Sequence, residues 1–183
     1  MKTRHVIDVI LSFTVVILFL AAGLTSIIFK NFYESYDGII LGTVLSVAGS
    51  ARIISYLIRR GWKKASNLNL VTGIAMIALA IVFFLDKFDI QMLCFGWGIM
   101  EIVLGLIEIQ VAIYQVRKEK IAIVEALISI GSIVFGILLC LKLYGGLGGH
   151  LIYLGISFIL MAALELTVTI RTLRINSKKK TEE

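Results

Sequence analysis

The chain has 183 residues, of which 59% are hydrophobic, and its mean hydropathy is +0.98. An ordinary soluble domain is about 45–50% apolar, and the excess here lies in blocks of about 18–25 residues, the length that crosses a bilayer. An ordinary soluble domain is therefore excluded. The net charge of +6 does not indicate nucleic-acid binding, because the basic residues flank the apolar blocks and do not line one polar face.

Six apolar blocks predict six transmembrane helices, in chain order at about 6–29, 39–58, 68–85, 91–115, 121–143 and 150–172. The first block follows Lys2 and Arg4 but is too long for the apolar part of a typical signal peptide, so we expect a retained first helix. No proline interrupts any block. We expect one all-α integral membrane domain over 1–175, followed by a polar, basic cytoplasmic tail at 176–183 that is frayed or disordered.

Basic residues are distributed unequally between the two sides that this topology defines. One side has only Lys30, Lys87 and Lys142. The other side has fourteen: Lys2, Arg4, Arg59, Arg60, Lys63, Lys64, Arg117, Lys118, Lys120, Arg171, Arg174, Lys178, Lys179 and Lys180. Because cytoplasmic segments are enriched in lysine and arginine, we expect a multi-pass protein of the cell membrane (inner or plasma) with both termini in the cytoplasm. The inner basic loops would contact anionic lipid headgroups.

Small residues seven positions apart recur along the chain. The even-numbered blocks contain Gly42 and Gly49, Gly98 and Gly105, and Gly155 and Ala162; the odd-numbered blocks contain Gly73 and Ala80, and Ser129 and Gly136, with Gly23 alone in the first. Corresponding positions are 56 or 57 residues apart, which predicts three parallel helical-hairpin repeats at about 5–60, 62–118 and 120–174. Residues seven apart share a helix face, so these pairs are interpreted as packing grooves; a backbone opening for a ligand is the alternative.

Charged residues inside the predicted spans are the most informative candidates for function. Arg52, Glu108 and Glu165 each follow the first small residue of a pair by ten positions, and Glu101 precedes Glu108 by seven. A charge within the bilayer costs at least about 2.5–3.5 kcal/mol on insertion scales, so these side chains are expected to face inward. Arg52 would pair with Glu108 or Glu165. At least one glutamate would be protonated at neutral pH, because burial without a partner favours the neutral form.

Two main interpretations of this intramembrane polar cluster stay open. In the first, Arg52 pairs with a glutamate and fixes the helix register, while Glu101 faces a wet crevice. In the second, the glutamates titrate and carry protons or sense pH. A polar pocket for a small cation or a lipid headgroup is a further alternative.

The remaining polar residues show no enzyme-like pattern. Asp8 and Glu125 lie near the starts of the first and fifth helices, where acidic side chains favour the helix dipole. Cys94 and Cys140 fit no metal motif and are expected to be free thiols, although a disulfide is conceivable. No catalytic, cofactor-binding or metal-binding set of residues is expected, so the chain is predicted to be no enzyme.

The whole pattern resembles the HdeD-type family of small bacterial six-helix membrane proteins. The stretches that carry the resemblance are Leu41–Gly49, Gly98–Glu108 with its continuation to Arg117, and Gly155–Arg171. The family often has a proline after its odd-numbered helices, and this chain has none. The resemblance implies a protein of the bacterial inner membrane that is linked to acid resistance and the stress response, without an established enzymatic activity or catalytic residues to carry over.

The leading expectation is therefore a non-enzymatic multi-pass membrane protein that supports acid or envelope stress tolerance. One alternative is a small transporter or channel for protons or a small solute that uses Arg52, Glu108 and Glu165. Another is a membrane-embedded assembly partner of other proteins. The lipid bilayer is the expected partner, a homo-oligomer is compatible with the glycine faces, and neither a cofactor nor nucleic acid is expected.

Overall fold

The computed structural model describes residues 2–60, 67–85, 90–116, 120–142 and 149–181. Within these ranges the chain forms six helices: α1 (Lys2–Ile28), α2 (Lys30–Arg60), α3 (Asn67–Phe84), α4 (Ile90–Gln115), α5 (Ile121–Cys140) and α6 (Gly149–Thr181). Hydroxyl groups inside the apolar helices donate to carbonyls one turn back, as Thr14 does to Ile10 at 2.9 Å. This bonding satisfies them where lipid offers no partner.

Two helices are longer than the sequence predicted. α2 begins at Lys30, nine residues before the apolar block at 39, and α6 continues to Thr181. The tail that the sequence predicts to be frayed or disordered from residue 176 is helical as far as Thr181. Lysine and threonine do not stop a helix, and no glycine or proline follows Gly155 to end it.

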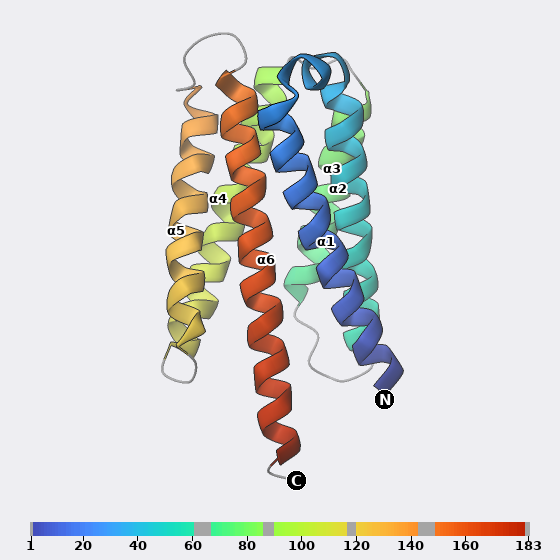
Figure 1. The fold of residues 1–183 in the computed structure, drawn as a ribbon, viewed down its shortest axis with the longest axis vertical. Helices are drawn as coiled ribbons and strands as arrows, with labels where there is room; N and C mark the ends of the chain where they lie inside the picture. Colours follow the sequence, from blue (N-terminus) through green and yellow to red (C-terminus); the bar gives the residue numbers. More distant parts are fainter. Residues whose placement is uncertain (1, 61–66, 86–89, 117–119, 143–148, 182–183) are drawn as a thin grey trace.

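The helices run side by side along the long axis of the molecule, and α3 and α4 lie behind the other four in the view of Figure 1. α1 begins and α6 ends at the same end of the bundle, here called the terminal end (Figure 1). Each helix packs on its neighbours in chain order, and α1 also packs on α6, so the six helices close into a ring. α3 and α4 meet only sparsely.

The outside of this bundle is apolar. Large aliphatic side chains on α1 to α5 point outward, among them Ile17, Ile74 and Leu127, each more than half exposed. Soluble monomers rarely expose apolar patches of that extent. Five helices of the described chain are long and apolar enough to cross a membrane, and the apolar part of α3, Leu70–Phe84, is shorter. The fold is thus that of a multi-pass helical membrane protein.

Glycines line three of the helix contacts. A Cβ on Gly49 of α2 would lie 2.7 Å from the carbonyl oxygen of Gly73 on α3. The same distance separates a Cβ on Gly98 of α4 from the carbonyl oxygen of Gly136 on α5, and a Cβ on Gly23 of α1 from that of Gly155 on α6. Only glycine permits so close an approach of two backbones, and such approach drives helix association in lipid.

The other residues of the predicted packing set lie in the same kinds of contact. Gly105 faces Ser129 and Ile133 on α5, and Gly42 faces the ring of Phe84 on α3. Ala80, Ser129 and Ala162 are buried. The tight contacts therefore join each predicted hairpin to the next one along the chain, and α6 back to α1.

Candidate functional site

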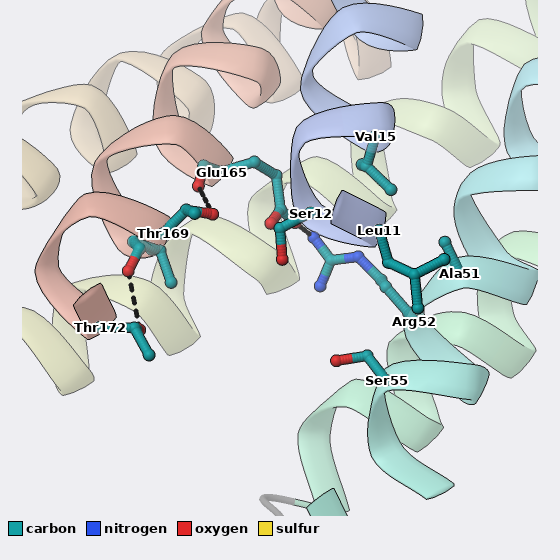
Figure 2. A pocket seen from close by; sticks show the side chains of 10 residues that line it. Leu11, Ser12, Val15, Ala51, Arg52, Ser55, Glu165, Thr169 and Thr172 are labelled. Carbon is teal, nitrogen blue, oxygen red and sulfur yellow. Dashed lines mark hydrogen bonds and ion pairs between the residues drawn. The ribbon is translucent and has the colours of Figure 1, made fainter. Parts of the chain in front are cut away.

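Arg52 connects three helices in the half of the bundle towards the terminal end. It extends from α2 and forms an ion pair with Glu165 of α6, as Figure 2 shows. Its Nη1 also donates to Thr72 Oγ1 of α3 at 3.3 Å. The structure thus gives Arg52 one of the two glutamate partners that the sequence predicted. The pair joins helices that are separated by three others along the chain.

A small polar pocket surrounds this ion pair, with a volume of about 60 Å³. Residues of α1, α2 and α6 line it: Leu11, Ser12, Val15, Ala51, Arg52, Ser55, Glu165, Val168, Thr169 and Thr172 (Figure 2). Four of them are hydroxyl residues. A polar cavity of this size has room for water, which needs about 10–15 Å³ and two to four polar partners.

A second ion pair connects α5 and α6. Arg171 and Glu125 pair directly and are more deeply enclosed than Arg52, with exposed fractions of 6% and 0%. The sequence interpreted Arg171 as one of the basic residues that flank the apolar blocks and Glu125 as an acid that favours the helix dipole, and the structure buries both in one ion pair. Glu125 lies beyond the first turn of α5, and Arg171 of the neighbouring helix α6 neutralises its charge. A helix dipole alone would not compensate a carboxylate that is completely buried, whereas a paired guanidinium group does.

Asp8 departs from the helix-start expectation in the same way. It lies beyond the first turn of α1, is buried, and accepts a hydrogen bond from the hydroxyl of Ser55 on α2. This bond joins the two helices of the first hairpin beside the pocket that Arg52 lines. Asp8 is therefore part of the same polar region as Arg52.

Glu108 is influenced by the arginines of both ion pairs. It is half-buried on α4, and the charges of both Arg52 and Arg171 act on it. The three positions that the sequence aligned, at Arg52, Glu108 and Glu165, thus lie in one electrostatic neighbourhood. The pair Arg52–Glu165 is in direct contact, and Glu108 is held within reach of a second arginine that the alignment did not include.

Glu101 lies apart from the arginines. Its side chain is completely enclosed between α4 and α6, with an exposed fraction of 0%. Ser157 of α6 donates to Glu101 Oε2, and Trp97 Nε1 donates to Ser157 Oγ at 2.6 Å. The expectation that Glu101 faces a wet crevice is wrong, because aromatic side chains fill the centre of the bundle where the crevice would have to run.

The sequence alone missed Arg171, Glu125, Asp8 and Ser157 as members of the interior. One signal was available for Arg171, since Ile170 precedes it and Leu173 follows it, so it still lies in apolar sequence. Ser157 carries no such signal, because serine is common on any helix face.

Three further expectations concern the cysteines, a metal site and the basic loops. Cys94 and Cys140 form no disulfide bond. In the described part of the chain no three histidine, cysteine, aspartate or glutamate residues are grouped to hold a metal ion. The basic loops that were expected to contact lipid headgroups fall mostly at 59–66 and 117–119, whose side chains lie outside the described residues.

Acidic groups outnumber arginines in the described interior. The described interior contains two guanidinium groups, those of Arg52 and Arg171, and four glutamate carboxyl groups, those of Glu101, Glu108, Glu125 and Glu165. An acid-rich interior without enough cations binds protons readily, because uncompensated carboxylates are costly inside a membrane.

No protein-family model, no curated protein and no solved structure matches this chain.

Proposed function

We propose that this chain is a non-enzymatic, six-span protein of a bacterial cell membrane that supports acid or envelope stress tolerance, as the HdeD-type family does. The observation that carries the proposal is the excess of carboxyl groups around the two ion pairs, where the three carboxyl groups of Glu108, Glu125 and Glu165 share the charges of Arg52 and Arg171. Carboxyl groups bind protons when the pH falls, so this interior changes its charge under acid conditions.

The six-span topology of the proposal requires α3 to cross the membrane with the other five helices. α3 has 18 residues and lies alongside α2 and α4, and about 17–25 residues suffice for a crossing. Its glycine contact with α2 would be buried in the hydrocarbon. The proposed repeat adds support, since the contacts Gly49–Gly73 and Gly105–Ser129 lie at positions 56 residues apart along both helices.

The proposed orientation has the terminal end of the bundle in the cytoplasm. With Arg171 left out because it is buried in the bundle, thirteen basic residues on that side against three on the other support it. A reporter fused after Glu183 that is active only in the cytoplasm would test the orientation directly. Activity of a periplasm-specific reporter at the same position would contradict it.

Acid survival tests the proposed function. Bacteria that produce the chain are expected to survive an acid challenge better than cells with an empty vector. The double variant Glu108→Gln, Glu165→Gln should bring survival down to the vector level, because glutamine keeps the shape of glutamate but cannot bind the proton. Ser50→Ala on the exposed face of α2 is the matched control. Equal survival of vector and wild-type cells would contradict the proposal.

A second candidate function is transport of protons or a small solute. The polar pocket around Arg52 favours it, because it brings hydroxyl groups and an ion pair to the interior of a membrane bundle. Purified protein in proteoliposomes with an internal pH dye would show proton flux on an imposed gradient. Flux that is lost in Glu108→Gln or Glu165→Gln would favour transport, and the same leak as empty vesicles would rule it out.

A further inference from the structure

Glu101 differs from the other interior acids by its surroundings. It lies in the membrane-spanning part of α4, next to an aromatic cluster formed by Phe19 of α1, Trp97 of α4 and Phe158 of α6. The ring centroids of Trp97 and Phe158 are 4.8 Å apart. These three side chains are almost completely buried, so water has no open path to the carboxyl group through this layer.

The hydrogen bonds around Glu101 leave one of its oxygens without a partner. Oε2 accepts the hydroxyl of Ser157, which in turn accepts the indole N–H of Trp97. Within the described part of the chain, no donor or acceptor reaches the buried Oε1. A carboxylate would leave several lone pairs of Oε1 uncompensated, whereas a protonated carboxyl group carries its own hydrogen there.

The charges that face Glu101 do not favour a carboxylate either. Arginine ion pairs compensate Glu125 and Glu165, but neither arginine is among the groups that act on Glu101. The described side chains near Glu101 on the neighbouring helices are uncharged. They are the thiol of Cys140 on α5 and the hydroxyl of Ser157 on α6, and α3 contributes apolar residues and Thr72 to its contact with α4. Glu108, two turns along α4, is itself acidic. No described neighbour thus supplies a positive charge.

We propose that Glu101, Ser157 and Trp97 form a proton-binding site at the contact of α4 and α6, in which the glutamate is a neutral carboxylic acid at neutral pH. The proton of Glu101 lies on Oε1. The Ser157 hydroxyl donates a hydrogen bond to Oε2, and the Trp97 indole N–H donates one to the Ser157 oxygen. Loss of this proton leaves a negative charge against three aromatic rings, so it weakens the contact of α4 with α1 and α6. This site goes beyond the acid-linked function above, because a Glu101 that is already protonated at pH 7 gains no proton when the pH falls.

Infrared difference spectroscopy of the purified protein in lipid tests the site without any assay of function. Alkaline titration of the wild type from pH 7 is expected to remove a C=O stretching band of a buried protonated carboxyl group. Glu101→Gln should abolish that band, and Glu165→Gln, whose glutamate is paired with Arg52, should leave it in place. Ser157→Ala should shift the band frequency, because it removes the hydrogen bond to Oε2.

A variant that retains a carboxyl group keeps the test decisive if Glu101→Gln does not fold. Glu101→Asp is expected to move the band and not to abolish it. A band that is unchanged in both Glu101 variants, or the absence of any such band in the wild type at pH 7, would overturn the proposal.

Trp97 offers an independent measure of the same site. The chain has two tryptophans, so Trp62→Phe leaves Trp97 alone to report. Its fluorescence should change with pH together with the infrared band, and this change should be lost in Glu101→Gln. Failure of the acid survival assay with an intact infrared result would reject the proposed function and leave the proton-binding site standing.

Discussion

The two faces of α4 are both apolar, yet they pack in opposite ways. Towards α5, Gly98 brings the backbones so close that a Cβ would lie 2.7 Å from the Gly136 carbonyl oxygen. Towards α3, the helices leave a groove of about 470 Å³ that is lined almost wholly by apolar side chains. Apolar character alone therefore does not bring helices together in lipid, where hydrocarbon is available everywhere. Close backbone packing does.

The proposed repeat explains why the groove lies between α3 and α4. In the third hairpin, Phe135 of α5 and Tyr153 of α6 meet with ring centroids 6.0 Å apart. The positions 56 and 57 residues earlier are Leu79 of α3 and Gly96 of α4, and both line the groove. Two rings in one hairpin thus correspond to one leucine and one glycine in the other.

The largest expected effect comes from breaking the close face. Gly98→Ala would place a methyl group 2.7 Å from the Gly136 oxygen and 2.8 Å from Cys140 Sγ. We expect the free energy of unfolding to fall by about 1–3 kcal/mol, the usual cost of overpacking. Unfolding by denaturing detergent in mixed micelles, followed by tryptophan fluorescence, measures it.

The matched control for this change is Gly131→Ala on α5. A Cβ there would lie 3.7 Å from Leu160, an ordinary contact, so the same methyl group should leave stability unchanged or raise it slightly through helix propensity. Equal losses at both positions would show that the close glycine contact between α4 and α5 is not what holds these helices together.

An intermediate effect is expected from closing the open face. The double variant Leu79→Phe, Gly96→Tyr would give the second hairpin the ring pair of the third. We expect a gain of about 0.5–1.5 kcal/mol in the free energy of unfolding, the value of an aromatic pair. Gly96→Ala controls for helix propensity. No gain beyond that of the control would count against the proposed equivalence of the two hairpins.

The smallest effect is expected from filling the groove without a new contact between the helices. Ala78 lines the groove, so Ala78→Leu would fill part of it with an aliphatic side chain in place of a lipid tail. Because lipid tails are as apolar as leucine, we expect stability to change by less than about 0.5 kcal/mol, as at an ordinary surface position. A large gain in the same micelle assay would mean that apolar burial alone drives packing at this face.

The helices were predictable from the sequence more completely than the site. The length of an apolar stretch of sequence predicts a membrane-spanning helix without reference to the rest of the chain. The glycines that the sequence analysis predicted to pack all lie at helix contacts. Arg52 was recognised because a lone arginine in an apolar block is conspicuous. Arg171 and Glu125 were missed because each is near the end of an apolar block, where charges are usually solvated, and only the neighbouring helix shows that they are buried together.

What the sequence determined by itself is the approximate positions of the apolar helices and the presence of an acid excess among them, since both depend on composition along short stretches. The tertiary structure alone decided which acids have an arginine partner. Glu101 and Ser157 are 56 residues apart, and Arg52 and Glu165 are farther apart still, so no local pattern could distinguish the paired carboxylate from the isolated one. The charge of a buried acid depends on whether a cation lies beside it and on how far its surroundings exclude water. Both are supplied by side chains of other helices.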